Sequence, residues 1–125
     1  MKRVLVVDDN VDSADSLSLL LGLMGHTVCT AHDGAEALQK AEAFRPELVL
    51  MDIGMPVMDG CEAARRLRQE DWGGEMVLVA LTGWGQDEDR RRTEDAGFNH
   101  HLIKPIDPVA LEKLLDETAP RTQSQ

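Results

Sequence analysis

Short apolar segments alternate with segments of helical periodicity along the whole chain. The apolar segments are rich in Val, Ile and Leu, have the length of buried strands, and occupy residues 4–7, 27–31, 48–51, 77–81 and 102–103. Between them, apolar side chains recur every three or four residues, as on one face of a helix, in segments 12–25, 34–44, 60–70 and 107–117. This alternation predicts strands and helices in turn.

The segment 85–98 is an exception, because it has almost no apolar stripe. Only its place in the alternation predicts a helix, and a helix with little apolar surface to bury is expected to be an element that moves. The other helices have clearer boundaries. The first is predicted to end at Gly25, and the second stops before Pro46. The last has Asp107 as its predicted N-cap and Pro108 at its first helical position.

Strands and helices in alternation predict an α/β fold, with a parallel sheet covered on both faces and joined by right-handed crossovers. We expect a flavodoxin-like, doubly wound (βα)5 architecture whose five-stranded parallel sheet has the order 2-1-3-4-5. A single domain over residues 1–119 accounts for all the periodic segments. Residues 120–125 are predicted to form a polar C-terminal tail.

Composition narrows the range of functions. The chain has 125 residues, enough to bury a core, and its hydrophobic content of 42% is ordinary for a globular protein. A formal net charge of −10 argues against direct binding to nucleic acid, which needs a basic surface. No apolar run approaches the ~18 residues of a membrane span, and Cys29 and Cys61 are most simply reduced thiols. We therefore expect a cytoplasmic protein that contacts neither nucleic acid nor membrane directly.

Polar side chains end the predicted strands. Asp8 and Asp9 follow the first strand, and Asp52 ends the third. Thr82 follows the fourth strand and Lys104 the fifth. In an open parallel sheet of this order, ligands bind beyond the carboxyl ends of strands 1 and 3, so the topology would gather these groups at one edge. Taken singly, Asp8 or Asp9 could instead cap the first helix.

Three carboxylates at one edge repel each other, and a divalent cation offsets that repulsion. A set of oxygen ligands without His or Cys favours Mg²⁺ over zinc, and a few carboxylates suffice because Mg²⁺ keeps several waters. Lys104 adds a cation suited to a phosphoryl oxygen, and Thr82 adds a rotatable hydroxyl. In-line phosphoryl transfer needs a metal ion, a carboxylate oxygen, a cation and a hydroxyl of this kind. The site is therefore predicted to phosphorylate Asp52, whose carboxylate would form an acyl phosphate.

The motifs around these residues resemble the receiver domain of two-component response regulators. The stretches VLVVDDN, LVLMDIGMPVMDG, ALTG and KPID occur in that family's order and spacing, and the similarity covers nearly the whole chain. Residues 80–105, ALTGWGQDEDRRRTEDAGFNHHLIKP, are similar to receivers attached to hybrid sensor histidine kinases. The resemblance implies a phosphoacceptor signalling domain of a phosphorelay. Such a domain is not an enzyme in the usual sense, although it supports its own phosphotransfer and autodephosphorylation.

The resemblance also implies a metal site and a phosphoacceptor. Asp52 would accept the phosphoryl group. Asp9 and Asp52 would ligate Mg²⁺ directly, and Asp8 would act mainly through water. The backbone carbonyl of Gly54 would be a third protein ligand. Mn²⁺ is the alternative ion.

The resemblance also implies roles for the remaining site residues. Thr82 would hydrogen-bond the phosphoryl group, and Lys104 would pair with it. The family's switch aromatic on the last strand is His101 here, a titratable ring that would swing behind Thr82, while a His simply packed at a strand edge is the alternative. Gly54 and Trp84 occupy the positions that influence acyl-phosphate lifetime in the family. Trp84 is predicted to shield the phosphoryl group from water and to slow its hydrolysis.

The implied partners are a sensor histidine kinase or a histidine phosphotransfer protein. Phosphorylation would shift the face made by the fourth helix, the fifth strand and the fifth helix, a face that would also suit a homodimer. The strongest rival is a receiver-like interaction module that works without phosphorylation. A haloacid-dehalogenase-type phosphatase would need a second Asp where Gly54 stands, and a flavodoxin would not carry DDNVDS after its first strand.

Overall fold

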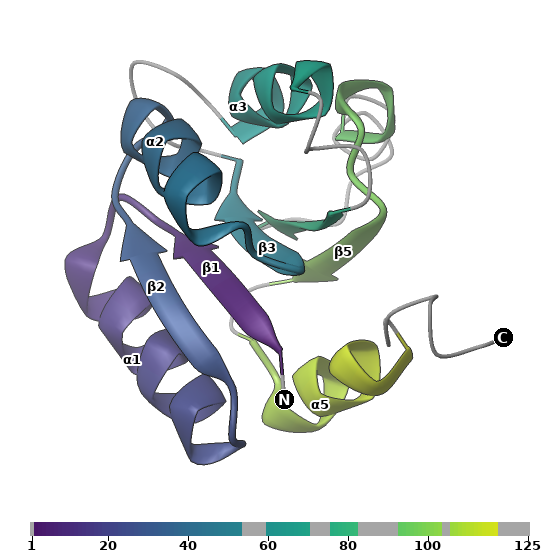
Figure 1. The fold of residues 1–125 in the computed structure, drawn as a ribbon. Coiled ribbons are helices and arrows are strands. Elements are labelled where there is room, and N and C mark those ends of the chain that lie inside the picture. The colour runs from purple at the N-terminus through teal and green to yellow at the C-terminus, as the bar shows by residue number, and fades with distance from the viewer. Residues whose placement is uncertain (1, 54–59, 71–75, 83–92, 104–105, 118–125) are drawn as a thin grey trace, which may run out of the picture.

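The computed structural model describes residues 2–53, 60–70, 76–82, 93–103 and 106–117. A five-stranded parallel sheet forms the centre of the molecule (Figure 1). Its strands are β1 (Arg3–Val7), β2 (Thr27–Ala31), β3 (Leu48–Asp52), β4 (Val77–Thr82) and β5 (His100–Ile103). They are arranged in the order β2-β1-β3-β4-β5, and every neighbouring pair is parallel. The predicted fold class and strand order are therefore confirmed.

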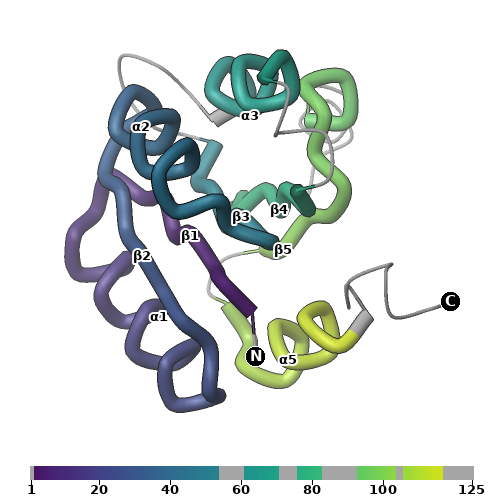
Figure 2. The backbone as a smooth tube through the Cα atoms, viewed as in Figure 1, coloured from purple at the N-terminus to yellow at the C-terminus, as the bar shows by residue number. Residues whose placement is uncertain are grey.

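Helices cover both faces of the sheet (Figures 1 and 2). α1 (Val11–Leu23) and α5 (Pro108–Glu117) lie on one face, and α2 (Gly34–Phe44) and α3 (Gly60–Gln69) lie on the other. Residues 93–96 add one helical turn, which is the described part of the predicted helix 85–98. Within the described residues, no helix is both long enough and apolar enough to cross a membrane. The predicted boundary between the domain and its polar tail lies outside the described residues.

Side chains that alternate along the strands divide the core in two. On β1, β3 and β4, the residues that face α2 and α3 are Leu5, Val7, Val49, Met51, Leu78 and Ala80. Those that face α1 and α5 are Val4, Val6, Leu48, Leu50, Val79 and Leu81. All are buried, as expected for the central strands of a parallel sheet covered on both faces. The unbroken apolar runs of the sequence reflect this burial, and the first polar residue after each run marks the edge of the core.

Polar side chains begin two helices at the carboxyl edge of the sheet. Asn10 is the N-cap of α1, and its Oδ1 accepts the N–H of Ser13 at 3.1 Å. Asp33 caps α2 by accepting the N–H of Glu36 at 2.7 Å, while Glu36 Oε1 accepts the N–H of His32 at 2.7 Å. The hydrogen bond from His32 holds the pKa of Glu36 below its ordinary value. These reciprocal bonds resemble a capping box and fix the loop after β2.

The other helix ends follow the sequence closely. α2 ends at Phe44, where Arg45 takes a left-handed conformation with φ 51° before the chain enters β3. Asp107 Oδ1 accepts a backbone N–H of the first turn of α5 at 3.1 Å, so the predicted N-cap is confirmed.

α1 ends at Leu23, slightly before the predicted Gly25, which has φ 97°. The N–H of Gly25 donates to the carbonyl of Gly22 at 3.0 Å, and the N–H of His26 donates to the carbonyl of Leu21 at 3.1 Å. These two bonds form a Schellman motif, so Gly25 ends the helix as predicted.

Arg68 joins α3 to the amino ends of β4 and β5. Its guanidinium donates to the carbonyl of Met76 at 2.7 Å, to the carbonyl of Gly97 at 2.8 Å, and to Oδ1 of Asn99 at 2.6 Å. Asn99 Oδ1 also accepts the N–H of Leu78 at 2.9 Å. Burial lowers the pKa of Arg68 from its ordinary value. We call this set of hydrogen bonds the Arg68 clamp, and it lies at the end of the sheet opposite the strand-ending acids.

Candidate functional site

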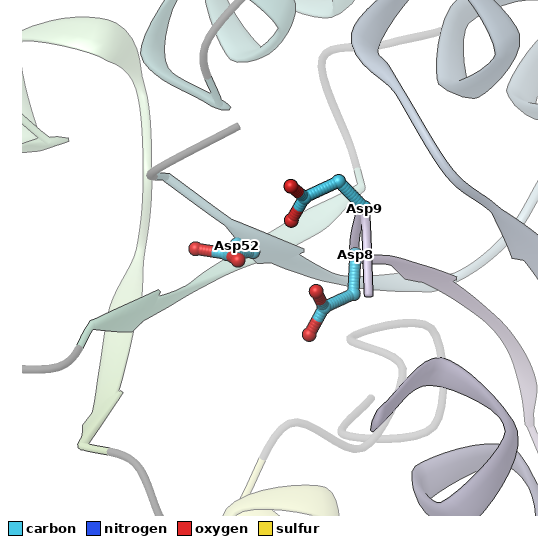
Figure 3. A group of neighbouring side chains, drawn as sticks. All are labelled: Asp8, Asp9 and Asp52. Atoms are coloured by element: carbon cyan, nitrogen blue, oxygen red, sulfur yellow. The ribbon is translucent and has the colours of Figure 1, made fainter. Parts of the chain in front are cut away.

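Three carboxylates meet at the carboxyl edge of the sheet, between β1 and β3 (Figure 3). Asp8 and Asp9 follow β1, and Asp52 is the last residue of β3. One carboxylate oxygen from each residue lies within 4.8 Å of the chosen oxygens of the other two. The three differ in burial, since Asp8 is 2% exposed, Asp52 is half-buried and Asp9 is exposed. The acid cluster formed by Asp8, Asp9 and Asp52 therefore opens to solvent on the side of Asp9.

Hydrogen bonds at the end of β1 position Asp8. Its N–H donates to the carbonyl of Ala31 at 3.0 Å, which continues the β1–β2 pairing beyond the strand. Its Oδ1 accepts the N–H of Asn10 at 3.0 Å, as in an Asx-type turn. Because Asn10 is itself the N-cap of α1, neither Asp8 nor Asp9 caps that helix. The interpretation of these acids as helix caps is therefore wrong.

The pairing of β3 with β4 positions Asp52. Asp52 is in register with Leu81, and the N–H of Ile53 donates to the carbonyl of Leu81 at 3.4 Å. The four preceding residues of β3 are buried, so Asp52 is the first position of the strand at which a charged group can reach solvent. The buried core of the sheet therefore lies behind Asp52, whose side chain is half-buried.

The acid cluster fits a hard divalent cation. Its ligand atoms are all carboxylate oxygens, and no imidazole or thiolate belongs to the group. Two unit charges separated by about 4.8 Å repel by about 1 kcal/mol in water and by about 3.5 kcal/mol at an effective dielectric constant of about 20. A divalent cation would replace this repulsion with attraction, and oxygen-only sets suit Mg²⁺ or Mn²⁺. The donor set and its charge therefore match the cofactor expected from the sequence.

The other predicted site residues are described only in part. Thr82 ends β4, is 4% exposed, and pairs with Ile103 of β5. Since Asp52 pairs with Leu81, the next residue, Thr82, lies at the same edge of the sheet as the acid cluster. The predicted residues Gly54, Trp84 and Lys104 lie outside the described residues.

His101 has a partner that the sequence did not suggest. It pairs with Ala80 in the β4–β5 register, and its Nε2 forms a hydrogen bond with Oγ1 of Thr93. Thr93 lies in the helical turn 93–96 and is fully buried. The ring is thus hydrogen-bonded to a neighbouring element and not merely packed at a strand edge. No sequence signal identified Thr93, because the surrounding segment lacks the apolar stripe that would orient it.

A groove of about 600 Å³ borders the acid cluster along α1. Its lining includes Asp8, Ser13, Ser16, Leu20, Leu81 and Ile106. Leu20 and Ile106 are only partly buried, so the groove presents apolar side chains and serine hydroxyls together. Such a mixture suits contact with another protein, in which apolar anchors and hydrogen bonds act side by side.

Comparison with known sequences identifies close similarity over nearly the whole chain. A family profile described as the response regulator receiver domain matches residues 4–116. The chain is 40% identical over 113 residues to response regulator MprA of Mycobacterium ulcerans, covering 90% of this chain and 47% of that protein. It is 39% identical over 114 residues to an uncharacterized 14.6 kDa protein of Leptolyngbya boryana, covering 91% and 87%. The chain thus spans about half the length of MprA and of the similar transcriptional regulator PrrA of Mycobacterium tuberculosis.

Solved structures share the fold. Chemotaxis protein CheY4 of Vibrio cholerae has 33% identity and a TM-score of 0.90, with 94% of this chain and 98% of that chain covered. The receiver domain of sensor histidine kinase PA1611 from Pseudomonas aeruginosa has 32% identity and a TM-score of 0.86, with 93% and 95% covered. That receiver was solved with a magnesium ion coordinated in its active-site cleft. Because a chemotaxis protein and a kinase receiver both match, association with hybrid kinases stays a prediction.

Proposed function

This chain belongs to the response regulator receiver domain family of two-component signalling, and on that premise we propose that Asp52 accepts a phosphoryl group from a phosphohistidine. A carboxylate oxygen of Asp52 attacks the phosphorus in line, and the bond from phosphorus to the donor imidazole breaks. The imidazole leaves with the bonding electrons, and Asp52 becomes an acyl phosphate. The observation that carries this proposal is the position of Asp52 within 4.8 Å of two other carboxylates, where the strand order reverses.

The acid cluster is the proposed metal site. Mg²⁺ or Mn²⁺, when bound, would neutralise charge on the carboxylates and on the phosphoryl oxygens. Asp9 and Asp52 would ligate the ion directly, Asp8 would act mainly through water, and the Gly54 carbonyl would complete the protein ligands. The magnesium ion in the Pseudomonas kinase receiver, at 32% identity, supports this assignment.

Three further residues would act on the phosphoryl group. The Thr82 hydroxyl would donate a hydrogen bond to a phosphoryl oxygen, and its position at the same sheet edge as Asp52 supports that role. Lys104, which follows β5, would pair with another phosphoryl oxygen. Trp84, two residues after Thr82, would shield the acyl phosphate from water and slow its hydrolysis, and Gly54 would be the other residue that influences its lifetime.

The donor is a sensor histidine kinase or a histidine phosphotransfer protein. We place its docking surface on the groove beside α1, because that groove borders the acid cluster and presents Leu20 and Ile106. Phosphorylation would then shift the face that contains the turn 93–96, β5 and α5, which is also the proposed surface for a homodimer. The activity that this signal controls would lie in a partner or in a further domain.

Intact mass spectrometry tests the proposal directly. The purified chain is incubated with acetyl phosphate and Mg²⁺, beside Asp52→Asn and beside Asp15→Asn as a matched control. Asp15 is an exposed acid in the middle of α1, so its substitution removes the same charge away from the cluster. The expected result is a gain of one phosphoryl group in the wild type and in Asp15→Asn, dependent on Mg²⁺ and absent in Asp52→Asn.

The same experiment decides against the proposal if the wild type gains no mass. A negative result with acetyl phosphate, repeated with phosphorylated histidine kinases as donors, would favour a receiver-like interaction module that works without phosphorylation. A gain that persists in Asp52→Asn would instead place the phosphoacceptor at another residue.

A further inference from the structure

A hydrogen bond between Thr93 and His101 links the helical turn 93–96 to β5. The Thr93 side chain is fully buried, and its Oγ1 is hydrogen-bonded to Nε2 of His101, which is half-buried. A buried hydroxyl that loses its partner is costly, so this contact restrains both residues. The next two residues, Glu94 and Asp95, are exposed.

The sheet register places His101 beside Thr82. Ala80 pairs with His101, and Thr82 pairs with Ile103. Side chains two residues apart on a strand share a face, and Ala80 packs in the core that faces α2 and α3. Thr82 and His101 therefore lie on that same face, two residues apart in the register of neighbouring strands. Leu102, between His101 and Ile103, packs against the opposite core.

We propose that Thr93 is a positioning residue that holds the His101 imidazole against the helical turn in the resting protein. This inference rests on the proposed function, in which the Thr82 hydroxyl moves to the phosphoryl group. That movement leaves space on the face shared by Thr82 and His101. The ring occupies the space only after its hydrogen bond to Thr93 breaks, so the bond opposes the activated arrangement.

The size of the effect follows from linkage. The net contribution of one such hydrogen bond corresponds to about a fivefold change in the ratio of the two ring positions. Coupling is reciprocal, so a ligand that favours the released ring binds more tightly when the ring is already free. Loss of the Thr93 hydroxyl should therefore tighten binding of a phosphoryl mimic by about fivefold.

Two substitutions separate the hydroxyl from the volume of the side chain. Thr93→Val removes the hydroxyl and keeps the shape, and Thr93→Ser keeps the hydroxyl and serves as the rescue control. Beryllium fluoride with Mg²⁺ is the probe, and its affinity is measured by titration of backbone amide signals. The imidazole nitrogen shifts of His101 are measured without the probe, with His100, which lies on the other face of β5, as the internal reference.

We expect Thr93→Val to shift the His101 Nε2 resonance while leaving His100 unchanged, and to bind the probe about fivefold more tightly. Thr93→Ser should match the wild type in both measurements. In a His101→Phe background, Thr93→Val should lose its effect on affinity, because the ring transmits it. Should Thr93→Val fail to fold, Thr93→Ala removes the same hydroxyl.

An unchanged His101 resonance in Thr93→Val would overturn the inference, as would an equal gain in affinity in the His101→Phe background. The two proposals fail separately. If the wild type does not bind beryllium fluoride with Mg²⁺, the proposed phosphoacceptor function fails. The His101 resonance then still decides whether Thr93 holds the ring.

Discussion

Replacing Asp9 by Asn is expected to stabilise the protein in the absence of divalent cations. Asp9 contributes one of three carboxylates whose oxygens lie within 4.8 Å of one another, so it takes part in two of the three repulsive pairs. The substitution removes its charge and nearly keeps its shape. Asp9 is exposed, so little packing is lost with the change.

The magnitude follows from the separation and the exposure. Each pair involving Asp9 repels by about 1 kcal/mol if water screens it fully, and by about 3.5 kcal/mol at an effective dielectric constant of about 20. Because Asp9 is exposed and salt screens further, the lower value is appropriate. We therefore expect Asp9→Asn to raise the free energy of unfolding by about 1 kcal/mol at low ionic strength, and by less at high salt.

Urea denaturation in EDTA and in millimolar MgCl₂ measures this effect. Mg²⁺ should stabilise the wild type by mass action and should stabilise Asp9→Asn much less, so that the order of stability reverses. Asp15→Asn, the matched control on α1, should respond to Mg²⁺ as the wild type does. If Asp9→Asn is less stable than the wild type in EDTA, the carboxylates of the acid cluster do not repel each other as argued. If Asp9→Asn gains as much stability from Mg²⁺ as the wild type does, the acid cluster is not the cation site.

Four other substitutions test local features of the fold. Arg68→Met should lower the free energy of unfolding by about 2–4 kcal/mol in urea titrations, because it removes the hydrogen bonds that the guanidinium donates to Met76, Gly97 and Asn99. Gly97→Ala should lower the free energy of unfolding by about 1–3 kcal/mol, since Gly97 has φ 104° and a Cβ would lie 2.8 Å from Cγ of Arg68. Gly22→Ala, with no atom within 4 Å of its Cβ, should stabilise α1 by about 0.5 kcal/mol. Equal effects at the two glycines would contradict the reasoning. Burial lowers the pKa of His26, whose Nδ1 accepts the N–H of Lys2 at 3.1 Å. The contribution of neutral His26 to stability is therefore complete above pH 6.5 and is lost as the pH falls through the lowered pKa. When the free energy of unfolding is measured from pH 7 to 5, the wild type should show this loss and His26→Phe should not.

The acids at the sheet edge were predictable, but their separate roles were not. Asp8, Asp9 and Asn10 are three consecutive residues that can each cap a helix, and no local pattern chooses among them. The turn after β1 makes the choice. Asp8 accepts the N–H of Asn10, and Asn10 accepts the N–H of Ser13, which frees the two acids from capping α1.

The sequence by itself determined the α/β class, the strand order expected for it, and the residues that end each strand. These features were readable because buried parallel strands need continuous apolar runs, and the first polar residue marks where burial stops. The tertiary structure alone decided that the three carboxylates approach within 4.8 Å, that Asp8 is buried while Asp9 is exposed, and that Thr93 meets His101. Distances between side chains and their hydrogen-bond partners depend on how distant segments pack against one another, and the local periodicity of the sequence does not specify that packing.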